Sequence, residues 1–436
     1  MSARKRFSLP ACESTIILGI SAPNFMRGWR ATIGVSTALA ALCLTMSLPQ
    51  ARAVTSKVIH HFNNEQGVNP EGVVVGPDGN LYGVTLNGSS NGLGGGTVFE
   101  LTPGPAASGR WLETKEFNIV NLANYPNGHL IFDSKMNLYG TALFGLGDIG
   151  VCGCCLCGNV GAVFELSPAT SGHGWHGTLL QNYYDEGYGG APLFPISGLV
   201  RDSAGNLHGV AEGNMVFNGL VYELVPGSDG TWTTILGAGG EGDIGPNLVL
   251  DATGNLYGTT VEDIDSNGSV FEVDTNQNLT TLYSFTGGAD GGNPQDQSNL
   301  IFDAAGNLYG TTQAGGANGL GTVFELSPNT DGSWTEKVLY SFNHAKGYGP
   351  TAGLIMDAAG NLFGEAYQGG DGGDGVVFEL TPGKNGHWKY IPLRSFYGPD
   401  GNGPSYGLVL DGKGNLYGTT WTGGTYGNGT VFEITP

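Results

Sequence analysis

Nearly the same ten residues recur along this chain, and this repetition constrains its fold more than any other feature. The stretch DATGNLYGTT lies at 251–260, DAAGNLYGTT at 303–312 and DGKGNLYGTT at 411–420. The asparagine of the motif occurs seven times, at spacings of 49 to 69 residues: Asn80, Asn137, Asn206, Asn255, Asn307, Asn361 and Asn415. Internal repeats of about 50 residues are typical of propellers and solenoids, in which each copy buries its apolar face against the next.

Each copy contains four short apolar segments separated by turn residues. In the fifth copy these are 299–303 (NLIFD), 307–312 (NLYGTT), 321–328 (GTVFELSP) and 334–342 (WTEKVLYSF). Val, Ile, Phe, Tyr and Thr favour strands, and glycine, which makes up 78 of the 436 residues, favours turns. The sequence therefore predicts an all-β chain that folds as a seven-bladed β-propeller with four-stranded antiparallel blades.

The repeated DAAGNLYG stretch predicts a tight turn between the first two strands of each blade. Asp303 should end the first strand and accept a hydrogen bond from the backbone N–H two residues on. Gly306 should adopt the positive φ that the turn needs. Gly310, inside the second strand, indicates the close approach of a neighbouring backbone.

The two ends of the repeat region predict how the ring closes. The last copy stops after its third segment, GTVFEITP, at Pro436, whereas residues 56–62 (SKVIHHF) match a fourth segment. We expect this N-terminal strand to pair into the last blade, because that blade would otherwise expose an unpaired edge.

Residues 1–53 have the pattern of a secretory signal. Two arginines precede an apolar stretch, and the small-x-small sequence ARA ends it at residue 53. Counted from Met26 the leader has the usual length, so Met26 is a candidate true start. We expect a leader over 1–53 and a propeller over 54–436, with no membrane span in the mature chain and a secreted or periplasmic location in a bacterium. A retained anchor is less favoured because the apolar stretch is short.

The charge of the chain excludes two classes of partner. Of its 17 Lys and Arg and 38 Asp and Glu, residues 54–436 keep 11 and 37, which gives a formal net charge of −26. A chain this acidic repels nucleic acid and anionic membranes, whose binding depends on Lys and Arg. We expect a monomer whose partners are glycans, peptides or cell-envelope components.

The recurring units GNLYGTT and GTVFELTP resemble the GloVer tandem-repeat family of bacterial exported proteins over roughly 72–436. The resemblance supports the propeller fold, and it implies no activity. Members of the family often carry a C-terminal sorting anchor, whereas this chain ends on the repeat. Release from the cell or residence in the periplasm is therefore expected.

Residues present in every copy, such as the glutamate of the VFE segment, are expected to be structural, so a localised function should lie where the copies differ. The connections after the second and fourth strands should share one face of the ring. They are acidic and rich in glycine, and they contain Tyr188, Tyr348, Tyr397 and Tyr406. Exposed aromatic rings beside carboxylates suit a glycan or a peptide, and we expect these tyrosines to bind one without catalysis. The alternative is that they are solvated loops whose tyrosines pack locally.

The stretch DIDSNGSVFEVD, 263–274, has the spacing of the first half of a calcium-binding loop. Its candidate ligands are Asp263, Asp265, Asn267, the backbone carbonyl of Ser269, and Asp274 at the twelfth position. Ca²⁺ prefers several oxygen ligands that converge around a tight turn, which this spacing supplies. The alternative is a plain acidic loop within the repeat background.

Four cysteines lie together in the segment that lengthens the second copy: Cys152, Cys154, Cys155 and Cys157. In an exported protein an even number of cysteines favours disulfides, here two, with three possible pairings. Thiolate metal binding and free thiols remain alternatives.

Two copies also carry ionisable residues where the others do not. The third has His208 in place of Tyr or Phe, with Glu212 four residues later, and the sixth has Glu365 in place of Thr. A histidine and a carboxylate at the mouth of the ring would serve as acid and base in an extracellular lyase or hydrolase acting on polysaccharide or peptide. The alternative is that these are tolerated substitutions.

Overall fold

The computed structural model describes residues 54–88, 95–105, 111–119, 122–145, 150–152, 155–157, 159–169, 174–184, 194–212, 219–239, 244–261, 267–294 and 299–436. Within these ranges, no helix is long and apolar enough to cross a membrane. The named helices are short 3₁₀ segments: η2 (His344–Lys346), η3 (Lys384–Gly386) and η4 (Gly398–Asp400).

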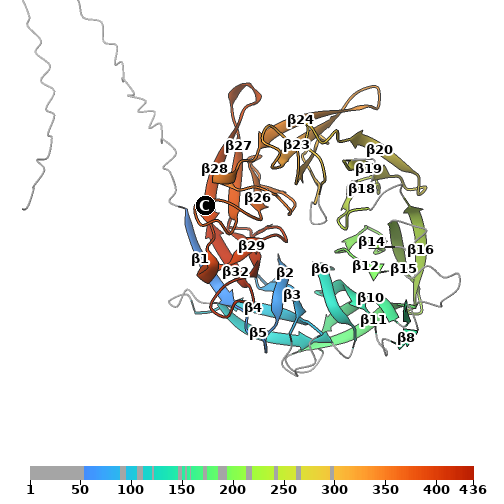
Figure 1. Cartoon of the computed structure of the whole chain (residues 1–436). Coiled ribbons are helices and arrows are strands. Elements are labelled where there is room, and N and C mark those ends of the chain that lie inside the picture. The colour runs from blue at the N-terminus through green and yellow to red at the C-terminus, as the bar shows by residue number, and fades with distance from the viewer. Residues whose placement is uncertain are drawn as a thin grey trace, which may run out of the picture. The chain divides into compact units, whose positions relative to one another are not determined.

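Seven antiparallel sheets form the blades of a propeller, as predicted, and the first strand of each blade lies nearest the axis while the last lies at the rim (Figure 1). Blades 1 to 4 consist of β2 (Val68–Val75), β3 (Leu81–Asn87), β4 (Thr97–Pro103), β5 (Trp111–Asn118); β6 (Asn124–Phe132), β7 (Leu138–Phe144), β10 (Asn159–Pro168), β11 (Trp175–Tyr184); β12 (Phe194–Pro195), β13 (Val200–Arg201), β14 (Leu207–Glu212), β15 (Leu220–Pro226), β16 (Trp232–Gly239); and β17 (Val249–Leu250), β18 (Leu256–Thr260), β19 (Ser269–Val273), β20 (Leu279–Ser284).

Blades 5 to 7 consist of β21 (Ile301–Phe302), β22 (Leu308–Thr312), β23 (Thr322–Pro328), β24 (Trp334–Ser341); β25 (Ile355–Met356), β26 (Leu362–Ala366), β27 (Val376–Pro382), β28 (Trp388–Ser395); and β29 (Asn402–Pro404), β30 (Val409–Leu410), β31 (Leu416–Thr422), β32 (Thr430–Thr435), β1 (Thr55–His61). The turns that join strands 1 to 2 and 3 to 4 lie at one end of the ring, the hairpin face. The connections between strands 2 and 3, and from one blade to the next, lie at the other end, the loop face.

The N-terminal strand closes the ring, as predicted. β1 pairs antiparallel with β32, the third strand of blade 7, from Thr55 opposite Thr435 to His61 opposite Thr430. Phe62, which follows β1, is fully buried against the core between blades 7 and 1. The two ends of the repeat region are thereby joined in one sheet, and β1 covers the edge of β32 that the last blade would otherwise expose.

The turn predicted from DAAGNLYG is confirmed. Oδ1 of Asp303 accepts hydrogen bonds from the backbone N–H groups of Ala305 (2.8 Å) and Asn307 (2.9 Å), and Gly306 has a φ of 87°. The hydroxyl of Tyr309 donates to the other carboxylate oxygen of Asp303 at 3.1 Å. The repeated aspartate therefore fixes the turn and also anchors the aromatic residue of the next strand.

The prediction for Gly310 was wrong in its detail. A Cβ at this position would lie 2.6 Å from Cζ of Phe324 and 2.8 Å from Cδ2 of Leu300. The close neighbours are thus side chains, chiefly the phenylalanine ring of the VFE segment, and not a backbone. The glycine of each NLYG motif makes room for that ring inside the blade interface.

Candidate functional site

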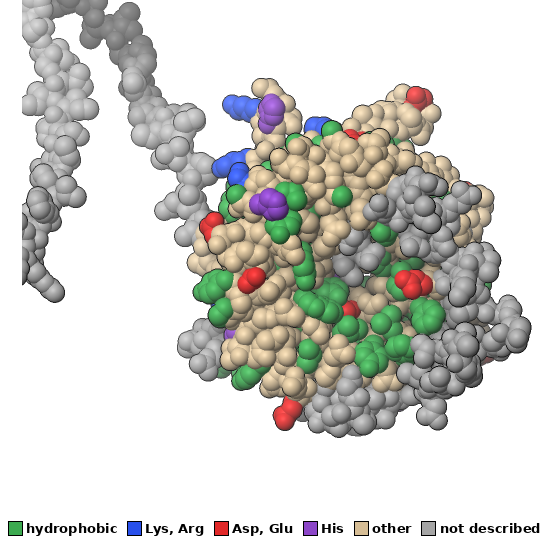
Figure 2. All heavy atoms as spheres, viewed as in Figure 1, with side chains coloured by type: hydrophobic (Ala, Val, Ile, Leu, Met, Phe, Trp, Pro, Cys, Tyr) green, Lys and Arg blue, Asp and Glu red, His purple; other side chains and the backbone are tan. Residues whose placement is uncertain are grey.

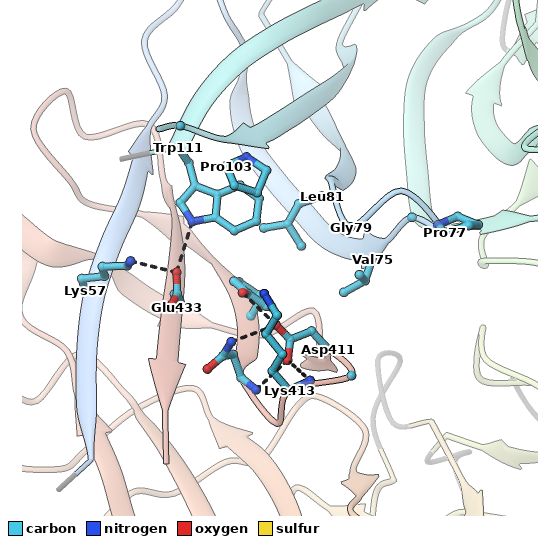
Figure 3. A pocket seen from close by; sticks show the side chains of 15 residues that line it. Lys57, Val75, Pro77, Gly79, Leu81, Pro103, Trp111, Asp411, Lys413 and Glu433 are labelled. Carbon is cyan, nitrogen blue, oxygen red and sulfur yellow. Dashed lines mark hydrogen bonds and ion pairs between the residues drawn. The ribbon is translucent and has the colours of Figure 1, made fainter. Parts of the chain in front are cut away.

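A pocket of about 660 Å³ lies on the hairpin face between blades 7 and 1 (Figure 3). We call it the Trp111 pocket. Its lining comes from β1, the first two strands of blade 1, the start of β5, the turn over 411–415 and the end of β32. The ring closure by β1 therefore builds part of this pocket.

Trp111 is held in the pocket by a polar and an aromatic contact. Its Nε1 donates to Oε2 of Glu433 at 3.1 Å, and Nζ of Lys57 lies 3.0 Å from the same oxygen (Figure 3). The indole packs edge-to-face against Tyr417, with 5.5 Å between the ring centroids. These contacts fix an aromatic surface next to an ion pair.

The turn over 411–415 places further polar groups on the opposite wall. Asp411 accepts hydrogen bonds from the N–H of Lys413 (2.8 Å), from the Asn415 side chain (2.8 Å) and from the hydroxyl of Tyr417 (3.2 Å). Burial alone raises the pKa of Asp411, but these hydrogen bonds outweigh it and lower the pKa below its usual value. The pocket thus offers an ionised carboxylate, an amide and an exposed lysine around its aromatic residues.

The loop-face tyrosines that the structure describes lie in different surroundings. Tyr348 lines a pocket of about 310 Å³ together with Tyr367, Gln313 and Gln368. Tyr397 is 56 % exposed at the start of η4. Tyr188 lies outside the described residues.

The expectation that Tyr406 is an exposed binding residue was wrong. Its side chain is buried, its hydroxyl donates to Oε1 of Glu71 at 3.1 Å, and its ring stacks on Trp421 with 5.7 Å between the centroids. The second oxygen of Glu71 accepts from the N–H of Gly128 at 3.0 Å. Tyr406 therefore ties blade 7 to blade 1, and Glu71 ties blade 1 to blade 2.

Two polar residues near the axis were missed by the sequence analysis, Glu71 and His129. Burial raises the pKa of Glu71 to about 7, although the hydrogen bonds from Gly128 and Tyr406 lower it in part. Burial lowers the pKa of His129 to about 4, so its imidazole is neutral at neutral pH. His129 lines a central cavity of about 230 Å³, to which all seven blades contribute residues that lie in or just before their first strands. The signal available in the sequence was that both residues depart from the repeat.

The three candidate acid and base residues are not brought together. His208 lies on β14 of blade 3, with Nε2 3.5 Å from Oδ2 of Asp202. Glu212 is exposed at the end of the same strand, on the loop face. Glu365 is fully buried on β26 of blade 6, where Oε2 accepts from the N–H of Gly407 at 2.9 Å. With blades 4 and 5 between His208 and Glu365, these residues do not form an acid–base pair.

The predicted calcium loop is divided by a strand. Asp263 and Asp265 lie outside the described residues. Asn267 precedes β19, and the side chain of Ser269 contacts Thr260 at 2.8 Å. Asp274 follows β19 at its opposite end, on the hairpin face, where it accepts from the N–H groups of Asn276 and Asn278. The extended strand therefore separates Asp274 from Asn267, so these two candidate ligands do not share one loop.

The cysteine segment contains a small hairpin on the loop face. β8 (Gly150–Cys152) pairs with β9 (Cys155–Cys157), with Cys152 opposite Cys155. Cys154 and the side chains of the other three cysteines lie outside the described part, so the disulfides stay a prediction.

Comparisons with known proteins identify the repeat family and several solved structures of similar fold. A family model described as the Gloeobacter/Verrucomicrobia repeat matches residues 195–432. No curated protein matches the chain. Similar solved structures include the gluconolactonase XC5397 from Xanthomonas campestris, which is 14 % identical, with 77 % of this chain and 94 % of that chain covered and a TM-score of 0.40. The polysaccharide lyase Uly1 is 10 % identical (87 % and 92 % covered, TM-score 0.49), and a protein of unknown function from Dyadobacter fermentans is 11 % identical (88 % and 98 % covered, TM-score 0.42). Similarities this low carry no inference about activity.

Proposed function

This chain belongs to the Gloeobacter/Verrucomicrobia repeat family, and we propose that it is an exported, non-catalytic protein that binds a glycan in the Trp111 pocket. The observation that carries the proposal is the set of groups around that pocket. An indole and a phenol lie beside an ionised carboxylate, an amide and two lysines (Figure 3). Export to the periplasm or the cell exterior follows from the predicted leader.

The groups in the pocket match the chemistry of sugars. A sugar ring presents an apolar C–H face, which packs on an aromatic ring, and a rim of hydroxyls, which need donors and acceptors in fixed positions. Trp111, which is half-buried, supplies the aromatic surface, and the buried ring of Tyr417 supports it from below. Asp411, Asn415 and Glu433 supply fixed polar groups. A volume of about 660 Å³ lies within the range of small-ligand sites, roughly 300–1,000 Å³.

The positive charge at this pocket suggests which glycans bind best. Lys57 and Lys413 both line the pocket, although residues 54–436 hold only 11 Lys and Arg. In the described part of the face shown in Figure 2, charged side chains are few and lie apart from one another. Lys57 is paired with Glu433, whereas Lys413 is exposed at the tip of its turn. A glycan that carries a carboxylate, such as a uronic acid, would meet Lys413 at the pocket rim.

The alternative of an extracellular lyase or hydrolase has weaker support. Of its candidate residues, His208 contacts Asp202 in blade 3, whereas Glu365 is buried in blade 6 and bonded to Gly407. Glu212 lies at the opposite end of β14 from His208. The Trp111 pocket contains carboxylates, but both Asp411 and Glu433 are occupied by hydrogen bonds that fix their position. We therefore favour binding over catalysis.

A glycan panel with two matched tryptophan variants tests the proposal. Trp111 packs on Tyr417 at the blade 7–1 interface, and Trp388 packs on Tyr309 in the same way at the blade 5–6 interface, outside the pocket. We expect Trp111→Ala to weaken glycan binding at least about tenfold, a typical loss for a central aromatic contact. Trp388→Ala should bind as the wild type does, although both variants lose a similar amount of stability.

Calorimetric titration of the purified protein with uronate-containing and neutral oligosaccharides gives the readout. Tighter binding of the uronates, with a loss in Lys413→Ala, would support the charge argument. Equal binding by Trp111→Ala and wild type would place the site elsewhere, and the loop-face pocket beside Tyr348 would be the next candidate. Failure of every oligosaccharide to bind would contradict the proposal itself.

A further inference from the structure

We infer that Asp202, His208 and Glu223 form a binding site for a divalent transition-metal ion on the hairpin face, at the interface of blades 3 and 4. One ligand atom from each side chain lies within 4.8 Å of those of the other two. Ligands of such an ion lie about 2.0–2.2 Å from the metal, and hence at most about 4.4 Å from one another. Shifts of less than about 1 Å would bring all three atoms into one coordination shell.

The backbone of blade 3 holds the three residues in place. Asp202 begins the turn between β13 and β14, and His208 lies on β14 directly opposite Glu223 on β15. Cross-strand partners project to the same side of a sheet, so the imidazole and the carboxylate are neighbours. The Asn206 amide donates to Asp202 at 2.9 Å and to Glu223 at 2.8 Å. Hydrogen bonds of this kind orient metal-binding carboxylates from the outer shell.

In several other blades a tyrosine at this position donates to the turn aspartate, as Tyr309 does to Asp303, and in blade 4 it also reaches the glutamate. In blade 4 the hydroxyl of Tyr257 lies 3.3 Å from Oδ2 of Asp251 and 3.1 Å from Oε1 of Glu272, so one phenol serves both acids. In blade 3 the distance from Nε2 of His208 to Oδ2 of Asp202 is 3.5 Å, which is long for a hydrogen bond.

The imidazole is buried, and within the described part of the chain its one side-chain contact with an acid is the long one from Nε2 to Asp202. His208 is 7 % exposed, and its Nδ1 has no hydrogen-bond partner among the described residues. A cation between the carboxylates would take the Nε2 lone pair, with the proton of the neutral ring then on Nδ1. Such a cation would take the place of the Tyr257 hydroxyl of blade 4.

A missing tryptophan opens space beside these residues. At several other interfaces the outer strand of the next blade begins with a tryptophan that packs on this aromatic position, as Trp175 does on Tyr82 with 5.8 Å between centroids. The outer strand of blade 4, β20, begins instead with Leu279. A pocket of about 460 Å³ lies there, lined by all three proposed ligands. It has room for the water molecules that complete the coordination of an ion held by three protein ligands.

The ligand set selects the class of ion. One imidazole nitrogen and two carboxylates suit Zn²⁺, Mn²⁺ or Fe²⁺, whereas Ca²⁺ takes about six to eight oxygen ligands. The histidine ligand and the small number of protein ligands distinguish this site from the calcium loop predicted over 263–274. Asp251 and Asp274 also line the pocket, and their negative charge favours the entry of a cation.

Titration of the purified protein with Zn²⁺, after chelator treatment and without a polyhistidine tag, tests the inference. We expect one equivalent to bind in the wild type, and His208→Tyr to weaken the affinity at least tenfold. This variant restores the residue of the neighbouring copy, so its fold should be retained. His387→Ala, which removes an exposed histidine far along the chain, should leave the affinity unchanged.

Asp202→Asn provides a second variant, with the same expected loss, in case His208→Tyr does not fold. X-ray absorption of the zinc-loaded wild type should show one imidazole among oxygen ligands. The inference is overturned if His208→Tyr binds Zn²⁺ with wild-type affinity and stoichiometry, or if the wild type binds none at micromolar concentrations.

Discussion

Replacing Glu365 by Gln should remove a large part of the dependence of stability on pH. Glu365 is fully buried, and burial raises its pKa to about 8, although the hydrogen bond from Gly407 lowers it in part. Gln has nearly the same shape and keeps an oxygen that accepts from the Gly407 N–H. The substitution therefore removes the titration while it preserves the packing.

The sign of the effect follows from the raised pKa. The folded protein binds this proton more tightly than the unfolded chain, whose Glu has a pKa near 4.5. The stabilising contribution is therefore complete below about pH 4.5, and it is lost as the pH rises through about 8. A difference of about 3.5 units, at 1.36 kcal/mol per unit, sets an upper limit of about 5 kcal/mol. The variant and the wild type should have similar stability near pH 4.5, and the variant should be more stable by about 3–5 kcal/mol at pH 9.

Urea unfolding of the purified protein at pH 5, 7 and 9 measures this difference. Glu65→Gln is the matched control, because Glu65 is an exposed glutamate and its replacement should leave the pH dependence unchanged. If Glu365→Gln loses stability between pH 5 and 9 as steeply as the wild type, burial of this carboxyl does not control the pH dependence. Glu71, whose pKa is raised to about 7, would then be the first group to replace instead.

Three further predictions concern the scaffold. Deletion of 54–63 removes β1 and exposes the edge of β32, so the melting temperature should fall markedly, and an unchanged melt would contradict closure by this strand. Gly310→Ala places a Cβ 2.6 Å from the Phe324 ring and should destabilise by about 1–3 kcal/mol in urea unfolding. Gly412→Ala, where a Cβ meets nothing within 4 Å, is its control, and equal losses would refute the packing argument. Asp303→Ala removes the hydrogen bonds that fix one turn and should cost about 1–3 kcal/mol, and a neutral result would show that the turn forms without them.

The repeat made the fold predictable because each copy solves the same local problem. Asp303, Gly306 and Asn307 specify a turn within a few residues, and the segments around them alternate as strands do. Every other copy has a fourth segment, so its absence from the last copy indicated that the N-terminal strand completes that blade. Even the error at Gly310 was one of detail, since the sequence indicated a close neighbour but not that it is the Phe324 ring.

The candidate sites were harder to predict because they depend on contacts between different copies, or between strands that only the folded blade brings together. Tyr406 was expected on the surface from its place in a glycine-rich loop, but its hydroxyl contacts Glu71, 335 residues away in sequence. The Trp111 pocket forms only where β1 joins the last blade to the first. His208 was recognised as a departure from the repeat, whereas the significance of Glu223, a residue present in every copy, appeared only when the two lay opposite each other on neighbouring strands.

A crystal structure of the protein with its tightest-binding oligosaccharide tests the central proposal most directly. The account predicts a sugar ring packed on Trp111 between blades 7 and 1, with its hydroxyls or carboxylate contacting Asp411, Asn415 or Lys413. A sugar bound instead on the loop face, with the Trp111 pocket unchanged, would contradict it.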